Sequence, residues 1–291
     1  VRCFGFDKID QNLPAVGRDP VSLSPRFKVR AIKRFLANGA GMMEQANYSF
    51  IDEEFVRNFS TKASLADGAI EIFNPVSENA RRLVTTLIPG LLKNVCNNYS
   101  DSDSLSFFEV GRIWAKERNN DSHAESGERM TVSGIAFEKN GEVGFYDWKE
   151  RVEEIFKVCQ VGSVKWSRPK QTEPIDEWWH PYQSAELIVD GRVVGIAGKV
   201  SSSFWPKLGL LPGADAFIFE IDAQFLADYS EEIVQFKKIS KFQENNFDLS
   251  FMVPIDVSVD EFYDSLIDCH SLVKSVDLLD FFEKDEWLVQ R

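Results

Sequence analysis

The chain of 291 residues is long enough for roughly two average domains, which excludes a small scaffold held together mainly by disulfide bonds. Hydrophobic residues make up 44% of it, and no run approaches the roughly 18 apolar residues of a membrane-spanning helix, so we expect a soluble globular protein. The net charge of −13 excludes nucleic-acid binding over a wide surface, because contacts with phosphates need cationic side chains. Any RNA contact must therefore be local.

The first predicted element is an amphipathic helix that begins near Ser24 and Pro25 and ends at Gly39, residues typical of helix starts and stops. One face is apolar, with Phe27, Ala31, Ile32 and Phe35 at helical spacing. The other face carries five basic side chains: Arg26, Lys28, Arg30, Lys33 and Arg34. This basic face is either a solvated surface or a docking site for an acidic partner or RNA.

Strands and helices alternate from there to residue 229. Hydrophobic spacing predicts strands at 45–51, 69–73, 105–114, 131–138, 184–189, 192–200 and 216–221, and helices at 83–99, 146–159 and 223–229. We expect a polar loop over 116–128, and Pro89 near the start of its helix. Asp190-Gly191 between two alternating runs indicates a β-hairpin. Together these elements predict an α+β fold with a largely antiparallel sheet.

After Lys237-Lys238 the pattern starts again, with a strand at 247–253, a helix at 259–269 and a strand at 273–282. This β-α-β unit looks like half of a split βαβ domain. Half a sheet exposes an unpaired edge and buries little apolar surface, so we expect the segment after Ser240 to be poorly ordered or to depend on the upstream domain. The last 52 residues carry 4 Lys+Arg against 12 Asp+Glu.

Residues that usually mark an active site are sparse. There are three histidines, His123, His180 and His270, and the four cysteines form no Cys-x-x-Cys pair, so the residues alone predict neither a metal site nor a catalytic triad. His180 follows Asp176 among aromatic residues, which leaves a hydrolase site open, although a packed loop histidine is the simpler interpretation. The cysteine usage and the lack of a signal-like segment favour a cytoplasmic protein whose sequence starts inside a longer chain.

Several segments, taken together in their order and spacing, resemble the C-terminal part of the β subunit of bacterial-type phenylalanine–tRNA ligases. They are VRCFGFDKI at 1–9 with Leu13-Pro14, NPVS at 74–77, LIPGLL at 87–92, FFEVGRI at 107–113, FYDWK at 145–149, His180-Pro181 with Ser184-Ala185, GIAG at 195–198, SKF at 240–242, FDL at 247–249 and LLDF at 278–281. Two positions depart from the family pattern: Val84 stands where an arginine is usual, and Gln243 where a proline is usual.

The resemblance implies three parts. Residues 1–20 are the end of a preceding domain or a linker, 21–238 form a class II aminoacyl-tRNA synthetase-like antiparallel sheet with flanking helices, and 239–291 are a truncated ferredoxin-like anticodon-binding domain. It further implies a non-catalytic scaffold for the catalytic α subunit in an α2β2 assembly that helps to bind tRNA(Phe). ATP and Mg²⁺ serve the complete enzyme, and this part binds no cofactor. Because the sequence has no Gly-x-Gly-x-x-Arg motif to hold a triphosphate, we expect the chain to be inactive alone, with no catalytic and no metal-binding residue.

The basic helix falls where the resemblance implies the class II dimerisation helix, so we predict its contact with the α subunit through Arg26, Phe27, Arg30, Ile32 and Phe35. The alternative is that these apolar side chains only close their own core. For RNA, the candidates are Lys241 on phosphate, Phe247 and Phe251 for base stacking, and Asp248 as an acceptor from a base edge. Packing of a core explains both phenylalanines as well.

Three other functions stay open at this point. The chain is alternatively a free-standing RNA-binding or regulatory relative of the β subunit, a hydrolase with its site near His180, or a purely structural partner-binding module.

Overall fold

The computed structural model divides the chain into two compact units, Val1–Val234 and Gln235–Arg291. The residues it describes are 3–8, 22–57, 69–116, 126–169, 176–211, 213–230, 236, 238–239, 241–254, 257, 259–280 and 282. His123 and Phe281 lie outside them. No helix among the described residues is long and apolar enough to cross a membrane.

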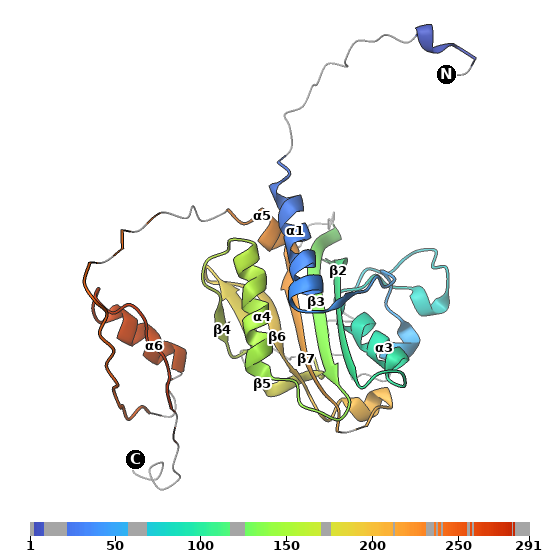
Figure 1. Cartoon of the computed structure of the whole chain (residues 1–291). Coiled ribbons are helices and arrows are strands. Elements are labelled where there is room, and N and C mark those ends of the chain that lie inside the picture. The colour runs from blue at the N-terminus through green and yellow to red at the C-terminus, as the bar shows by residue number, and fades with distance from the viewer. Residues whose placement is uncertain are drawn as a thin grey trace. The chain divides into compact units, whose positions relative to one another are not determined.

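The first unit is built on a seven-stranded sheet in the order β1-β2-β3-β7-β6-β5-β4 (Figure 1). Its strands are β1 (Met43–Glu44), β2 (Ser104–Lys116), β3 (Ser126–Glu138), β4 (Lys165–Ser167), β5 (Trp179–Val189), β6 (Arg192–Val200) and β7 (Asp215–Asp222). Every neighbouring pair is antiparallel except β1 with β2. The predicted α+β class and the largely antiparallel sheet are confirmed.

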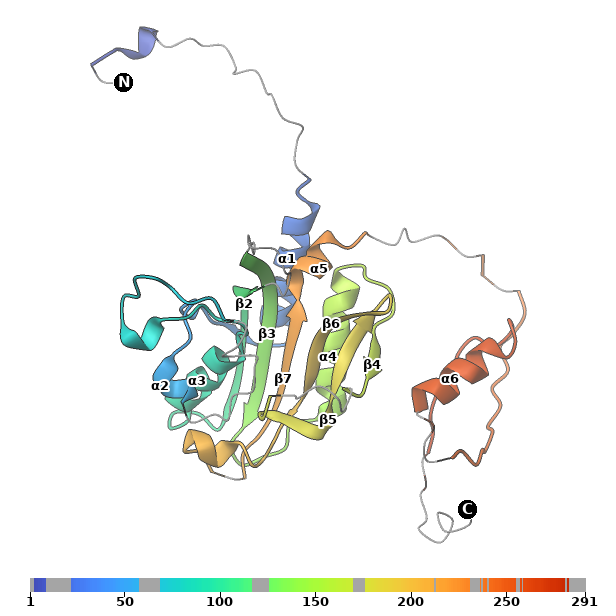
Figure 2. The same cartoon turned by 180° about the vertical axis from the view of Figure 1, so that it is seen from behind.

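Helices cover both faces of this sheet. The helices of the unit are α1 (Ser24–Arg34), which continues as a π-helix over Phe35–Gly39, α2 (Glu53–Val56), α3 (Ile88–Asn98), α4 (Phe145–Val158) and α5 (Ala223–Asp228), with 3-10 turns at Phe6–Lys8, Glu78–Ala80 and Trp205–Leu208. α1, α4 and α5 bury one face of the sheet (Figure 1). α3 and the turn at Trp205 bury the other, where α3 lies against β2 and β3 (Figure 2).

Local sequence signals account for most of these elements. The apolar stripe of α4 is fully inside, with Val152 and Ile155 at 0% exposure. Asp222 caps α5 by accepting a hydrogen bond from the backbone N–H of Phe225 at 2.8 Å. The predicted hairpin is confirmed: Asp190 and Gly191 both have positive φ, 50° and 77°, which is the geometry of a type I′ turn.

Two predicted strands of the first unit are wrong. Residues 45–51 do not form a strand beyond an isolated bridge of Phe50 with Leu83, and 69–73 contribute only a bridge of Glu71 with Arg82. The side chain of Glu109 holds Asn47 of the first segment, whereas backbone hydrogen bonds among the described residues join the second segment only to residues 81–83. The predicted loop at 116–128 is shorter than expected, since β2 runs to Lys116 and β3 begins at Ser126.

The second unit contains α6 (Val259–Asp268), which confirms the predicted helix. The strands predicted at 247–253 and 273–282 are not formed by the residues described there. A strand needs ladder hydrogen bonds from a neighbour, and this short unit supplies no further strand among its described residues. Its apolar side chains consequently stay open to solvent, as with Phe247 at 80% exposure.

The side chains around Gly134 of β3 leave no room for a larger residue. A Cβ atom there would lie 2.5 Å from the ring of Phe219 and 2.9 Å from Cε of Met42. We expect Gly134→Ala to lower the free energy of unfolding by about 1–3 kcal/mol, because a filled core does not absorb a methyl group. Urea unfolding measures this. The matched control is Gly213→Ala, where a Cβ meets no atom within 4 Å; equal losses in the two variants would contradict the packing described here.

Candidate functional site

A row of polar side chains crosses the sheet on the face that α3 covers. Glu109 on β2 pairs with Ser133 on β3, and Ser133 pairs with Glu220 on β7. Side chains alternate between the faces of a strand, and the next side chains on this face, such as Ile135 and Ile218, belong to the core under α3. We call Glu109, Ser133 and Glu220 the carboxylate row.

Glu220 gathers three donors around one oxygen. Its Oε2 accepts hydrogen bonds from Thr86 Oγ1 at 2.8 Å, from the backbone N–H of Leu87 at 2.9 Å and from Ser133 Oγ at 2.7 Å. Burial raises the pKa of Glu220, which these three donors oppose and the nearby charge of Asp176 reinforces. Glu220 therefore ties the segment that precedes α3 to the middle of the sheet.

Glu109 does the same for the segment before α2. It is buried, and its two oxygens accept hydrogen bonds from the backbone N–H of Asn47 at 2.9 Å and from Asn47 Nδ2 at 2.8 Å. This bond pattern explains why residues 45–51 do not continue as a strand. Two positions along β2, Gly111 leaves room for the start of α3, since a Cβ there would lie 3.1 Å from the side chain of Leu87.

This arrangement does not fit a nucleotide. The row presents two carboxylates, and both carboxylates already accept hydrogen bonds from donors of the chain itself. A triphosphate needs cationic groups instead, because they stabilise the charge that develops on its oxygens. Within the part of the chain that the structure describes, no group of three or more His, Cys, Asp or Glu side chains is placed to hold a metal ion.

The residues of α1 that were predicted to contact the α subunit differ in their exposure to solvent. Arg26, Phe27 and Arg30 are exposed, with Phe27 at 62% exposure, whereas Ile32 is fully buried in this chain's own core and Phe35 packs against that core. Ile32 is therefore not available for contact with a partner. Ile32 and Phe35 instead pack in this chain's own core, which was the alternative interpretation.

Lys28 also departs from the predicted basic face. It is buried, and its Nζ donates a hydrogen bond to the backbone oxygen of Tyr229 at 2.6 Å. It thus ties α1 to the end of α5. What remains on the outside of α1 is a stripe of Leu23, Phe27, Arg30 and Arg34, all exposed and spaced three or four residues apart. We call these four residues the α1 stripe.

The predicted RNA contacts lie in the second unit. Lys241, Phe247 and Asp248 are exposed there. Phe251 is half-exposed and stacks edge-on against Phe262 of α6, with the ring centroids 5.1 Å apart. Phe251 is thus partly used for packing, and Phe247 is the more accessible aromatic ring.

The ring of His180 bonds to the backbone of its own strand, β5. Its Nδ1 accepts hydrogen bonds from the backbone N–H groups of Tyr182 at 3.2 Å and Gln183 at 3.0 Å. Because Nδ1 is the acceptor, the neutral ring carries its proton on Nε2, so neither nitrogen is ready to take a proton from a substrate, which disfavours the hydrolase interpretation.

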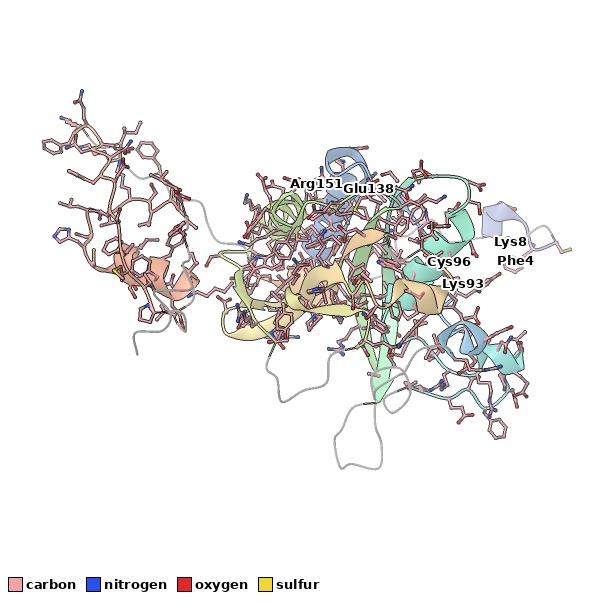
Figure 3. The ribbon with its side chains drawn as sticks, turned by 90° about the horizontal axis from the view of Figure 1, so that it is seen from below. Phe4, Lys8, Lys93, Cys96, Glu138 and Arg151 are labelled. Carbon is pink, nitrogen blue, oxygen red and sulfur yellow. The ribbon has the colours of Figure 1, made fainter. Side chains whose placement is uncertain are left out.

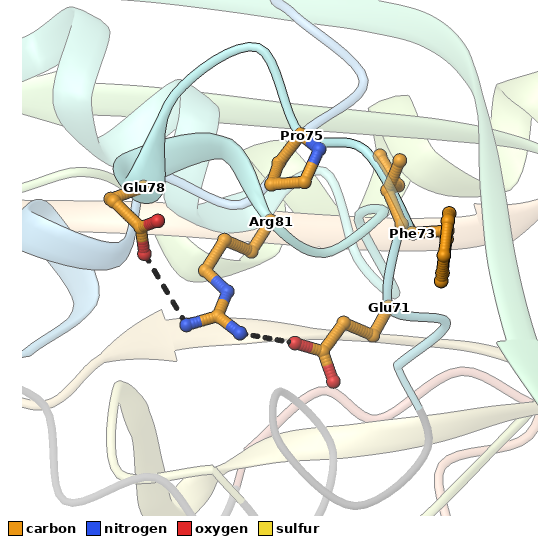
Figure 4. A pocket seen from close by; sticks show the side chains of 6 residues that line it. Glu71, Phe73, Pro75, Glu78 and Arg81 are labelled. Atoms are coloured by element: carbon orange, nitrogen blue, oxygen red, sulfur yellow. Dashed lines mark hydrogen bonds and ion pairs between the residues drawn. The ribbon is translucent and has the colours of Figure 1, made fainter.

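The surface of the first unit is hollowed in places. One hollow of about 480 Å³ is lined by Glu71, Phe73, Pro75, Glu78 and Arg81 (Figure 4). Another of about 280 Å³ lies between β2, β3 and the start of α4, and Glu138 and Arg151 line it (Figure 3). Figure 3 also shows Lys93 on α3, whose Nζ pairs with Asp52.

Sequence reasoning missed the carboxylate row. A signal was present, because Glu109 and Glu220 each interrupt a run of apolar residues in a predicted strand. A charged residue inside such a run is expected to be buried with partners. The sequence did not reveal which partners these are, because Asn47 and Thr86 are far from both glutamates in sequence.

Comparison with known proteins identifies the family of the chain. The family model described as "Phenylalanyl tRNA synthetase beta chain CLM domain" matches residues 9–223. The chain belongs to this family.

Curated relatives agree with this assignment. The phenylalanine–tRNA ligase beta subunit of Syntrophus aciditrophicus is 26% identical over 89% of this chain and 32% of the relative. That of Nitrosospira multiformis is 25% identical over 97% of this chain and 34% of the relative. That of Neisseria meningitidis is 27% identical over 89% and 32%. The chain thus spans about a third of the length of the curated relatives it matches.

The environment of Glu220 predicts a pH dependence of stability. Burial raises the pKa of Glu220 above the ordinary value of 4.5. At pH values between 4.5 and this raised pKa, the folded protein therefore keeps a proton on the carboxyl that the unfolded chain has lost. The free energy of unfolding contributed by this group falls as the pH rises from 4.5 through the raised pKa. Glu220→Gln keeps an acceptor but does not titrate, so this fall should be absent from the variant.

Urea unfolding at several pH values between 4.5 and 8 measures this difference, with Glu150→Gln on the exposed side of α4 as the control. Identical pH profiles for the wild type and Glu220→Gln would contradict the assignment. Glu220→Ala leaves three donors without their acceptor, and we expect it to lower the free energy of unfolding by about 3 kcal/mol.

Proposed function

We propose that this chain is a non-catalytic portion of the β subunit of a phenylalanine–tRNA ligase. In this role it scaffolds the catalytic α subunit and helps to bind tRNA(Phe) in an α2β2 assembly in the cytoplasm. ATP and Mg²⁺ serve the complete enzyme. The observation that carries the proposal is the family match over residues 9–223, together with a central sheet face occupied by the chain's own carboxylates.

The architecture supports a class II synthetase-like domain over 21–238. Six of the seven strands form an antiparallel series and helices flank the sheet. Function is nevertheless determined by the site rather than by the fold. In this chain Glu109 and Glu220 occupy the middle of the sheet, so it acts as a scaffold that does not itself activate phenylalanine. In this proposal residues 1–20 are the end of a preceding domain or a linker, and 239–291 are a truncated ferredoxin-like anticodon-binding domain.

The α1 stripe is the surface proposed for the α subunit. Phe27 and Leu23 provide apolar area that is exposed in this chain, and Arg30 and Arg34 lie on the same side of the helix. Aromatic and arginine side chains are the ones that most often dominate binding energy at protein interfaces. Arg26 lies beside the stripe and is exposed as well.

Changes in the α1 stripe test the scaffold role. We expect Phe27→Asp with Arg30→Glu to raise the dissociation constant for a separately purified catalytic α subunit at least thirtyfold, which corresponds to about 2 kcal/mol. Light scattering and a titration measure the complex. Phe27 and Arg30 are exposed, so the melting temperature should not change.

The control variant is Tyr146→Asp, an aromatic side chain on α4 that is also exposed. It should bind the α subunit like the wild type. An unchanged complex in the Phe27→Asp, Arg30→Glu variant would remove the α1 stripe from the interface. No complex with the wild type would favour a free-standing relative of the β subunit.

The second unit is the part proposed to touch tRNA. Its acidic balance makes the contact local, through Lys241 on a phosphate and Phe247 under a base, with Asp248 next to Phe247. Phe251 takes part mainly by holding α6 against its own segment.

Nucleic-acid binding by this unit predicts two distinct effects. Phe247→Ala should weaken tRNA(Phe) binding about tenfold at any salt concentration, because it removes one stacked base. Lys241→Ala should lower the slope of log affinity against log salt by about one, because it removes one phosphate contact. Filter binding at several salt concentrations measures both. Leu272→Ala, an exposed apolar side chain of the same unit, is the control, and equal losses in all three variants would contradict specific contacts.

A further inference from the structure

The sequence contains two Asn-Gly pairs, Asn38-Gly39 and Asn140-Gly141. In such a pair the backbone nitrogen of the glycine can attack the side-chain amide of the asparagine, because glycine has no Cβ to crowd the approach. The reaction requires that Cγ of the asparagine swing toward the nitrogen of the next residue. The local backbone therefore determines which of the two pairs is reactive.

Asn140-Gly141 lies in a bend between β3, which ends at Glu138, and α4, which begins at Phe145. Both residues of the pair are exposed. Among the residues that the structure describes, neither the side chain of Asn140 nor the backbone N–H of Gly141 has a hydrogen-bond partner. The reacting amide and the reacting nitrogen are thus both accessible and unengaged.

The connection is fixed on either side of this pair. The backbone N–H of Lys139 donates to Asp103 O at 2.7 Å, and that of Val143 donates to the carboxylate of Asp215 at 2.8 Å. Between these two anchors, the torsions of Asn140 can change without breaking a ladder or helix hydrogen bond. The bend therefore permits the rotation that the attack requires.

Asn38 provides the internal comparison. It is also exposed, but it lies in the π-helix Phe35–Gly39 that continues α1. There the backbone N–H of Ala40 donates to Phe35 O at 2.9 Å. Side chains on a helix tilt toward its N-terminus, so Cγ of Asn38 leans away from the nitrogen of Gly39. The two asparagines thus share their exposure and their following glycine, and differ in their backbone.

We propose that Asn140 is a site of spontaneous deamidation, with water as the co-reactant. The nitrogen of Gly141 forms a bond with Cγ of Asn140, and the bond between Cγ and Nδ2 breaks. Nδ2 leaves as ammonia and takes the proton of the Gly141 N–H, so that a succinimide ring remains. Water then opens the ring at either carbonyl and leaves aspartate or isoaspartate. No atom is oxidised or reduced in either step.

The product changes both charge and backbone. It carries a carboxylate in a connection that already holds Glu138 and Glu142, and such a modification alters local electrostatics. Isoaspartate also lengthens the backbone by one carbon between the anchors at Lys139 and Val143. This inference concerns the ageing of the chain and does not rest on the function proposed above.

Peptide mapping of the whole folded chain tests the proposal. The chain is incubated at mildly alkaline pH, and samples taken over several weeks are digested and analysed by mass spectrometry. Trypsin cleaves after Arg34 and after Lys139, so the two asparagines fall in different peptides. We expect the peptide that begins at Asn140 to gain one mass unit at least tenfold faster than the peptide that contains Asn38, because helical structure protects the latter.

Two controls separate backbone structure from local sequence. In urea the backbones no longer differ, so both peptides should gain mass at similar rates. Gly141→Ala should slow the reaction at Asn140 several-fold, because its methyl group hinders the attack. The new Cβ would lie 3.6 Å from Cβ of Glu138, an ordinary contact, so the melting temperature should not change.

Three results would overturn the proposal. The first is a folded chain in which Asn38 reacts as fast as Asn140. The second is a folded chain in which Asn140 stays intact while it reacts in urea. The third is a Gly141→Ala variant that reacts at Asn140 as the wild type does.

Discussion

Two carboxylates in the middle of the sheet determine how the rest of the first unit is arranged. Glu220 accepts hydrogen bonds from Thr86 and Leu87, and Glu109 accepts them from Asn47. Both carboxylates lie under segments that cross the sheet, and buried charges are tolerated only with such partners. The segments that they hold lead directly into α2 and α3. The hydrogen bonds that hold these segments over the sheet face are therefore the same ones that make this face unsuited to a triphosphate.

Among the described residues, both sheet faces are covered by the chain's own helices and loops. With the sheet covered in this way, the surface that we propose for the α subunit is the α1 stripe on the outside of the chain. On this stripe the exposed ring of Phe27 lies on the same side of the helix as Arg30 and Arg34.

Much of the fold was predictable from the sequence, and the exceptions share a physical cause. The apolar spacing of α4 and the Asp190-Gly191 turn are local signals, and both predictions are confirmed. Residues 45–51 are not a strand because Glu109, distant in sequence, takes up Asn47. The helical pattern of α1 separated two faces but did not reveal that Lys28 and Ile32 are both buried, since burial depends on α5 and the sheet. The strands predicted in the second unit failed because pairing requires a neighbour that local sequence does not provide.

The most direct test of the account is a titration of the chain with Mg·ATP, followed through the amide NMR signals of Asn47 and Leu87. Both amides are hydrogen-bonded to the two glutamates of the carboxylate row, so they report on any ligand that enters this face. We predict no saturable shift of either signal up to millimolar nucleotide. A saturable shift of both would contradict it, because it would show that the carboxylate row opens to bind a triphosphate.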